Sequence, residues 1–336
     1  MIKAFKIGDK TYTSNGDVVI AATKAKVKNS DNGEFSLDLV CPEKYSKYVK
    51  ASNIIVCPTP QGEQPFRIWN VKHGRKSIEA KCLHVYHDSG NLIIPDHYVE
   101  DRTCEYALTY FNEHLDSESP FTVHSDVTGT NSLRCERETF EDCIESILER
   151  WGGHLVRDKW DISIKADISR DNGINIEYGK NLQDLTATYD WTNVCTKLLP
   201  VGKDGQLLDS LYVNAPISYE IPFTKTVSFQ QDIDQEDYPT EEAYIAALKA
   251  DLLAQATKYV NTYCKPSVNY TIKGRPEKVS DIGDIIRVKD RVMGVDITTQ
   301  VIAYEYDAIS GKYSSLEFGN NKVTVKTAIE DLIKKS

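Results

Sequence analysis

The chain contains the segments Asn53-Ile-Ile-Val56, Phe66-Arg-Ile-Trp-Asn-Val71 and Ser77-Ile-Glu-Ala-Lys-Cys-Leu83, three short runs of β-forming residues. Three runs with similar spacing recur near the other end: Asp284-Ile-Ile-Arg-Val288, Thr299-Gln-Val-Ile-Ala-Tyr-Glu-Tyr306 and Tyr313-Ser-Ser-Leu-Glu-Phe318. Recurrence of one unit along a sequence is the signature of related structural modules. The repeat therefore predicts two related β domains that are separated by an insertion.

Residues 1–100 form the first predicted β domain. Lys24–Asn29 alternates apolar with polar residues, and Glu34–Val40 does the same. The polar stretch Ser30-Asp31-Asn32-Gly33 between them indicates a hairpin turn, since Asn and Gly both tolerate positive φ. Further strands are expected at 53–57 and 66–71 and from Ser77 to Tyr86. Short strands at regular spacing favour a sandwich or small barrel.

Residues 101–200 are predicted to be an α+β insertion with two helices. The first covers Cys104 to His114. The second ends at Trp151, before Gly152-Gly153, and Thr139 with Asp142 approximates a capping box at its start. A strand is expected at 120–125 between the helices.

The second β domain is predicted from residues 201–235 and 266–325. The intervening helix, 236–265, begins at Pro239-Thr240 with acidic residues in its first turn and runs to about Thr262. Residues 326–336 form a tail, and the basic stretch from Lys322 to Lys335 is expected to be a short helix. The predicted class is α+β, mostly β.

Composition excludes several classes of protein. The 336 residues include 40 Lys and Arg against 50 Asp and Glu, a net charge of −10, which argues against a dedicated nucleic-acid binder. The chain is 40% hydrophobic and 27% charged, as in an ordinary globular protein. No apolar window is long enough for a membrane span, and the charges in Met1–Gly8 argue against a signal peptide. Synthesis in the cytoplasm is expected.

Metal sites are not favoured by the sequence. The eight cysteines form no Cys-x-x-Cys pair, so we interpret them as small buried hydrophobes. Cys82, His84, His87, Asp88 and His97 could supply zinc ligands, but 82 and 84 share one face of the expected strand while 87 lies opposite. Strand residues satisfied by hydrogen bonds are the favoured interpretation.

Catalytic residues are not apparent either. A carboxylate pair could come from Glu136, Glu138 and Glu141, or from Glu145 and Glu149, but a solvated helix face explains these acids better. The acidic run 232–237 lacks the glycine and final glutamate of a calcium loop, and Gly202–Gly205 reads as a turn. The sequence therefore predicts no catalytic, cofactor-binding or metal-binding residue, and no cofactor.

Several stretches resemble the prophage endopeptidase tail, or tail-associated (Tal-like), hub proteins of phage tails. The most specific are Tyr178-Gly-Lys-Asn-Leu182 and the Pro200-Val-Gly-Lys-Asp-Gly205 turn. The resemblance extends over about residues 1–325. The other stretches that carry it are Ala107-Leu108, 120–126, 147–153, 171–177, 193–199, 80–93, 282–288 and 316–320.

The resemblance implies the fold of a contractile-tail baseplate hub, with two tube-type β-barrel domains and α+β decoration. It also implies a homotrimeric ring in the virion that contacts tail tube, distal tail, tape measure and spike or fibre proteins. Phage DNA would pass through this ring without specific binding. Longer relatives carry a lytic peptidase or lysozyme-like module, whose motifs are missing from this sequence, so we expect a non-enzyme. A cell-wall hydrolase and a glycan receptor-binding protein are the alternatives.

Overall fold

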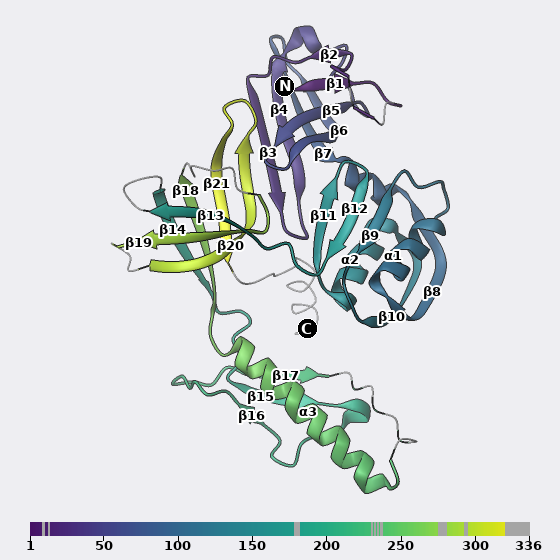
Figure 1. Ribbon diagram of the computed structural model, residues 1–336, viewed down its shortest axis with the longest axis vertical. Helices are drawn as coiled ribbons and strands as arrows, with labels where there is room; N and C mark the ends of the chain where they lie inside the picture. Colours follow the sequence, from purple (N-terminus) through teal and green to yellow (C-terminus); the bar gives the residue numbers. More distant parts are fainter. Residues whose placement is uncertain are drawn as a thin grey trace. The chain divides into compact units, whose positions relative to one another are not determined.

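The computed structural model describes residues 1–8, 11–12, 14–177, 182–229, 231, 233, 235, 238–274, 281–291 and 295–319. These residues are mostly β, as predicted. The chain divides into two compact units (Figure 1). Unit 1 comprises residues 1–186 and 270–336, and unit 2 comprises residues 187–269.

The six segments of the repeat are all strands, and each triplet forms an antiparallel meander. In the first, β5 (Ile54–Thr59) pairs with β6 (Gly62–His73), which pairs with β7 (Ser77–His84). In the second, β19 (Asp284–Asp290) pairs with β20 (Val295–Asp307), which pairs with β21 (Lys312–Gly319).

The correspondence between the two triplets extends to two further strands in each set. β7 continues to β4 (Phe35–Pro42) and β3 (Lys24–Ser30), while β21 continues to β18 (Ser267–Gly274) and β14 (Leu182–Asp190). The strand orders β3-β4-β7-β6-β5 and β14-β18-β21-β20-β19 therefore correspond strand for strand. We call these five-stranded sets motif 1 and motif 2. Both belong to one 13-stranded sheet, because β3 also pairs with β20.

A β-bulge marks the same point of both motifs. Trp69 is the extra residue of β6 opposite β7, and Ile302 is the extra residue of β20 opposite β21. The residue before each bulge accepts a hydrogen bond from a residue with positive φ. Ser52 N–H (φ 72°) donates to Ile68 O at 3.1 Å, and Gly283 N–H (φ 91°) donates to Val301 O at 2.9 Å.

The two motifs share one hydrophobic core, to which equivalent positions contribute. Ile55 and Ile286, Ile68 and Val301, and Cys82 and Phe318 are all almost fully buried in it. β1 (Lys3–Phe5) and β2 (Val18–Val19) extend motif 1 beyond β5, and β13 (Arg170–Glu177) lies parallel to β19 in motif 2. Among the described strands, no pairing closes either motif into a barrel, so barrel closure stays a prediction.

An α+β lobe with its own core connects the motifs. The lobe consists of a 3₁₀ turn η2 (Val85–Asn91), β8 (Ile93–Thr103), α1 (Cys104–Glu113), β9 (Thr122–Ser125), β10 (Thr130–Thr139), α2 (Phe140–Trp151), β11 (His154–Asp158) and β12 (Asp161–Lys165). β8 pairs with β10, and β12 lies between β11 and β9. Both predicted helices are present. The capping box of Thr139 and Asp142 is confirmed.

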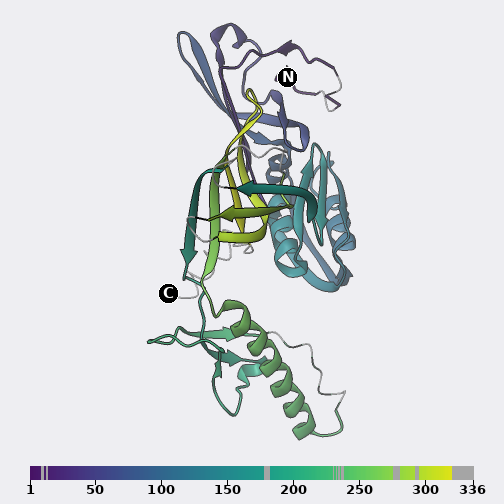
Figure 2. The same ribbon diagram turned by 60° about the vertical axis from the view of Figure 1, so that its left-hand side comes forward.

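Unit 2 includes the end of β14 and the start of β18, and most of it lies in sequence between these two strands, where motif 1 has only the short turn between β3 and β4. Its sheet is β16 (Val213–Asn214), β15 (Lys197–Val201) and β17 (Thr224–Ser228). α3 (Glu241–Tyr263), the predicted third helix, lies across this sheet in both ribbon views (Figure 2). Its Leu248, Leu252, Ala256 and Val260 are buried at four-residue spacing.

Some local details differ from the sequence-based expectations. β7 ends at His84 and not at Tyr86, because residues 85–91 turn into η2. In the Ser30–Gly33 turn only Asn32 has positive φ (52°). The strands at 197–228 form the separate sheet of unit 2, and the limits of independently folding domains stay a prediction. The expected helix at 322–335 lies outside the described residues.

Candidate functional site

The seam between the two motifs is the first feature of the candidate site. Residues 303–307 of β20 pair antiparallel with residues 26–30 of β3. Asp31 N–H donates to Ile302 O at 2.8 Å at one end of the paired segment, and Ala308 N–H donates to Ala25 O at 2.9 Å at the other. The side chains of Lys26 and Glu305 form an ion pair across the seam. We use the term seam for this pairing of β3 with β20.

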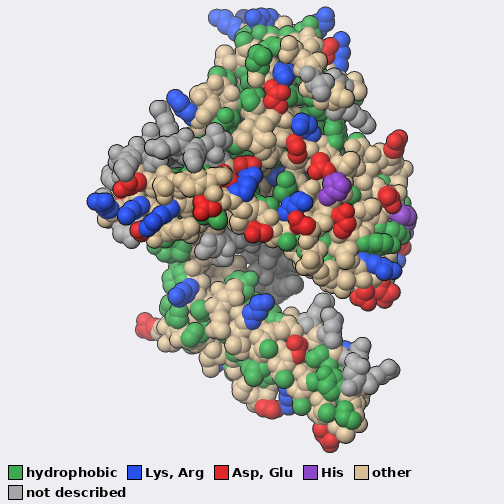
Figure 3. Space-filling model, in the orientation of Figure 1, with side chains coloured by type: hydrophobic (Ala, Val, Ile, Leu, Met, Phe, Trp, Pro, Cys, Tyr) green, Lys and Arg blue, Asp and Glu red, His purple; other side chains and the backbone are tan. Residues whose placement is uncertain are grey.

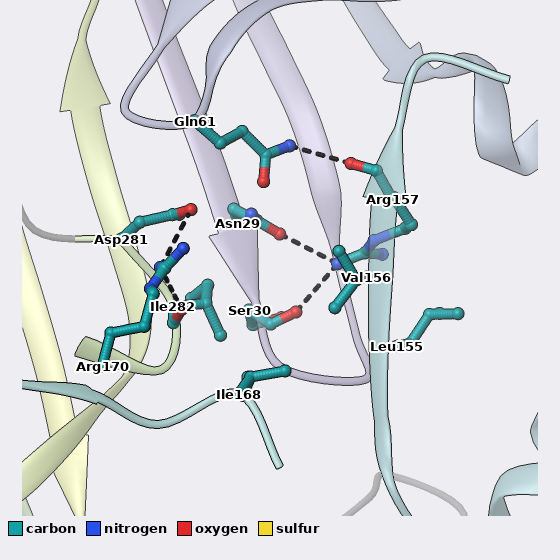
Figure 4. A pocket seen from close by; sticks show the side chains of 10 residues that line it. All are labelled: Asn29, Ser30, Gln61, Leu155, Val156, Arg157, Ile168, Arg170, Asp281 and Ile282. Carbon is teal, nitrogen blue, oxygen red and sulfur yellow. Dashed lines mark hydrogen bonds and ion pairs between the residues drawn. The ribbon is translucent and has the colours of Figure 1, made fainter. Parts of the chain in front are cut away.

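A small cavity of about 70 Å³ lies beside the seam (Figure 4). It is lined by five stretches of the chain: the β3 end, the turn between β5 and β6, β11 of the α+β lobe, residues 168–170 around the start of β13, and the turn before β19. Its lining consists of Asn29, Ser30, Gln61, Leu155, Val156, Arg157, Ile168, Arg170, Asp281 and Ile282.

Arg157 is the central group of this cavity and is only 4% exposed. Its guanidinium donates to Asn29 Oδ1 and to Ser30 O, both at 2.9 Å, and also to the carbonyl of Gly33. It lies 5.2 Å from the ring centroid of Phe35, in cation–π geometry. Burial lowers the pKa of Arg157 from its ordinary value, and these acceptors compensate for the lost hydration.

The Ser30–Gly33 turn is bonded to the lobe by further polar contacts. Asn32 Nδ2 donates to Gly153 O at 3.1 Å, and Leu155 N–H donates to Asn32 Oδ1 at 2.6 Å. The His154 ring lies 3.0 Å from an Asp31 carboxylate oxygen, and both side chains are nearly buried. The hairpin turn that the sequence predicts is therefore also the docking point of the α+β lobe.

Arg170 holds the opposite wall of the cavity. It donates to Asp284 Oδ1 at 2.9 Å and to Ile282 O at 2.9 Å, and its Nη2 lies 3.5 Å from Asp281. Burial raises the pKa of Asp281, and its buried Oδ1 has no hydrogen-bond partner among the described residues. The cavity groups hold backbone segments together, so we interpret the cavity as a structural joint.

The residues considered for zinc lie in separate environments. Cys82 is in the shared core, and His84 stacks on Phe35 with ring centroids 4.4 Å apart. His87 contacts Glu141 at 2.6 Å, and His97 packs against Tyr110. Among the described residues, no group of three or more His, Cys, Asp or Glu is placed to hold a metal. All eight cysteines are buried and free, as predicted.

The candidate carboxylates divide between two elements. The expectation of a helix face is wrong for Glu136 and Glu138, which lie on the strand β10, while Glu145 and Glu149 are exposed on α2. The expectation that Glu141 belongs to the solvated helix face is wrong, because η2 brings His87 against it. Gly202–Gly205 is a turn, as predicted, with a 3₁₀ turn η3 at Lys203–Gly205. The run 232–237 is largely outside the described residues.

Sequence reasoning did not identify the residues of the joint. Arg157 and Asp281 lie in polar stretches that resemble any surface segment, and their burial arises from contacts between segments more than 100 residues apart. The sequence pattern places Trp69 in a strand but does not reveal that its side chain is 73% exposed at the bulge. Within the described part of the chain, no helix is long and apolar enough to cross a membrane.

The prophage endopeptidase tail family matches residues 170–329 of the chain. This match, which begins at β13 and covers motif 2 and unit 2, confirms the resemblance found in the sequence. No curated protein matches the chain by sequence.

Solved structures of phage tail proteins have the same fold. The prophage tail protein gp18 from Listeria monocytogenes EGD-e is 15% identical with a TM-score of 0.67, and the match covers 99% of this chain and 98% of that chain. The 43 kDa tail protein of prophage MuSo2 from Shewanella oneidensis is 14% identical with a TM-score of 0.63, covering 94% and 96%.

A type VI secretion component is also similar. The E. coli c3393 protein, described as structurally similar to the T4 bacteriophage tail proteins gp27 and gp5, is 9% identical with a TM-score of 0.53. That match covers 96% of this chain and 78% of the other. The fold of the chain is therefore that of phage tail and baseplate hub-like proteins.

Proposed function

We propose that the chain is a structural hub protein of a phage or prophage tail tip. In this proposal it forms a homotrimeric ring that caps the tail tube and becomes part of the DNA conduit during infection. The observation that supports the proposal most is that the two motifs have the same strand order. They occur in a chain whose fold is shared with prophage tail proteins.

The repeat gives the ring a physical basis. Three chains with two equivalent motifs each would present six similar units around an axis, which suits stacking on a sixfold tube. Rings built from repeated heterologous contacts are a normal closed form of oligomer. Tail tube, distal tail, tape measure and spike or fibre proteins are the proposed partners, and the virion is the proposed location.

The net charge of −10 suits a conduit. A lumen rich in Lys and Arg would bind phosphates and retard DNA, whereas a neutral or acidic wall would let DNA pass. The chain is therefore expected to contact passing DNA without binding it. The proposed function requires no cofactor.

A test of this function uses the phage or lysogen that encodes the chain. Deletion of the gene should give particles without functional tails, and a gold-labelled antibody to the chain should mark the distal end of wild-type tails. Normal tails from the deletion strain, or label along the tube or at the capsid, would overturn the proposal.

A peptidoglycan endopeptidase is the second candidate, favoured by the description of the matching family. We propose a non-enzyme instead, since the polar groups at the joint, with the buried Arg157 at their centre, hold backbone segments together. A zymogram with purified chain and host cell wall separates the two: a hub leaves the wall intact, and a clearing zone would support the peptidase.

A further inference from the structure

Two thiols meet in the core of the α+β lobe. The Sγ atoms of Cys135 and Cys143 lie 2.8 Å apart, in hydrogen-bond contact, and both residues are fully buried. A disulfide bond is about 2.05 Å long, so the two sulfurs have to approach by less than about 1 Å to bond. The thiols of Cys57, Cys195 and Cys264, by contrast, contact backbone carbonyl oxygens.

The fold of the lobe places the two cysteines opposite each other. Cys135 lies on β10, where it and Leu133 alternate with exposed residues and enter the lobe core. Cys143 lies on the buried face of α2, three residues after Phe140 and four before Ile147. β10 leads directly into α2 (Figure 1), and the capping box holds the corner between them. Regular secondary structure on both sides therefore fixes the approach of the two sulfurs.

A bond between these sulfurs would tie α2 to β10. It would close a short loop, residues 135–143, and a closed loop stabilises a fold mainly by restricting the unfolded chain. β11, which carries Arg157, begins three residues after the end of α2. The bond would therefore also restrain the start of the strand through which the lobe reaches the seam.

The environment of the pair makes its thiols slow to react. Burial raises the pKa of Cys143, and the contact with Cys135 and the carboxylates of Glu138 and Asp142 raise that pKa further. Since the thiolate is the reactive form, oxidation has to be slow. Slow reaction does not suit a catalytic redox pair, but it suits a bond that accumulates with time in an oxidising medium.

Size and charge determine which oxidant can react. A bulky disulfide cannot reach fully buried sulfurs. Asp and Glu side chains gather on the face of the lobe that Figure 3 shows, and they repel anionic oxidants such as oxidised glutathione. A hydroperoxide such as hydrogen peroxide is small and uncharged, and it can enter when the first turn of α2 opens locally.

We propose that Cys135 and Cys143 are thiols while the chain is made and are joined in a disulfide by a hydroperoxide once the chain has left the cytoplasm. One thiolate attacks an oxygen of hydrogen peroxide, which breaks the O–O bond, gives a sulfenic acid and releases hydroxide. The second thiol then attacks this sulfur, the S–S bond forms, and the sulfenic oxygen leaves as hydroxide.

The balance of this reaction is complete. The two thiol protons convert the two hydroxides into two molecules of water, and the two electrons that the sulfurs lose reduce the peroxide. The bond itself does not depend on the proposed function. Only the release from the cell rests on it, because a tail protein leaves its host with the particle.

Peptide mapping of the purified full chain tests the bond directly. The chain is held with hydrogen peroxide just below the onset of unfolding, free thiols are blocked with N-ethylmaleimide in denaturant, and trypsin is added. Cleavage after Arg134, Arg137 and Arg150 puts the two cysteines on separate peptides, 135–137 and 138–150. These peptides should be recovered joined and should separate on reduction, while the other six of the eight cysteines are blocked.

The melting temperature gives a second measurement. Oxidation should raise the Tm of the wild-type chain by about 5 °C, as expected for closure of a short loop. Cys135→Ala and Cys143→Ala should show no increase, whereas Cys104→Ala, which changes a cysteine buried in the same core, should keep it. Each variant is compared with itself before and after oxidation, so its own loss of stability cancels.

Two results would overturn the inference. One is a folded, peroxide-treated chain whose 135–137 and 138–150 peptides stay separate or carry sulfinic or sulfonic acid. The other is an equal increase in Tm for Cys143→Ala.

The phage supplies the test of release. Thiols blocked before lysis should give separate peptides, and tails stored after lysis should give joined ones. Separate peptides from stored tails would overturn the inference while the hub function stands. Absence of the chain from purified tails would instead overturn the proposed function.

Discussion

Arg157 on β11 donates a hydrogen bond of 2.9 Å to Asn29 on β3, the strand that joins the two motifs. The α+β lobe is thus bonded directly to the seam. Since β3 is also held by β4 and β20, the lobe and both motifs converge on one strand. We infer that this joint fixes the geometry of the lobe relative to both motifs, which the proposed ring would require.

Arg157→Met should strongly destabilise unit 1. The substitution removes the donor for Asn29 Oδ1 and for two backbone carbonyls, leaving buried acceptors unsatisfied. We expect the free energy of unfolding in urea to fall by about 3 kcal/mol. Arg134→Met is the control, because Arg134 pairs with Asp96 on the surface, and its unfolding should stay close to wild type. Equal effects of the two variants would contradict the role of the joint.

Substitutions at Ser52 and Gly283, the two equivalent residues with positive φ, should change stability in opposite directions. Ser52 is held at φ 72°, so Ser52→Gly relieves strain and should stabilise the protein by about 0.5–1 kcal/mol. At Gly283 a Cβ would lie 2.3 Å from Ile168 O, so Gly283→Ala should destabilise by more than about 2 kcal/mol. Thermal unfolding of both variants measures this, and shifts of the same sign would refute the account.

The capping box of α2 should behave as a coupled pair. Thr139 Oγ1 accepts from Asp142 N–H at 3.1 Å, and Asp142 Oδ2 accepts from the Thr139 hydroxyl at 2.7 Å. Thr139→Ala should cost about 1 kcal/mol. In a double-mutant cycle with Asp142→Ala, the combined loss should be smaller than the sum of the single losses. Additive losses would show that the two side chains act independently.

His84 should make stability depend on pH. Burial, and secondly the charge of Arg157, lower the pKa of His84 well below its ordinary 6.5. Below pH 6.5 the unfolded chain binds a proton that the folded chain does not, so this contribution is present above pH 6.5 and is lost as the pH falls. The slope is at most about 1.4 kcal/mol per pH unit.

The measurement is the difference in unfolding free energy between pH 7.0 and pH 5.5. His84→Gln should reduce that difference, whereas His124→Gln, at an exposed position, should keep it. If His84→Gln has the same difference in unfolding free energy as the wild type, another group causes the pH dependence.

The sequence predicts local elements well and contacts between distant segments poorly. The helix 140–151 is identifiable because its cap, apolar spacing and stop signal are all local. The repeat is identifiable because β-forming residues recur at similar spacing. The match of the two bulges at Trp69 and Ile302 depends on strand register, which single segments do not reveal.

The joint and the His87–Glu141 contact could not be predicted, for a physical reason. Arg157, His87 and Asp281 are buried by segments that are remote in sequence, and polar residues give no periodic signal of burial. The pairing of β14 with β18 likewise joins segments about 80 residues apart, so the sequence does not reveal that the strands between them form the separate sheet of unit 2.

Cryo-electron microscopy of the assembled tail tests the central claim most directly. The account predicts three copies of the chain in a ring on the tail axis. A chain located off the axis, or a copy number other than three at the tail tip, would contradict it.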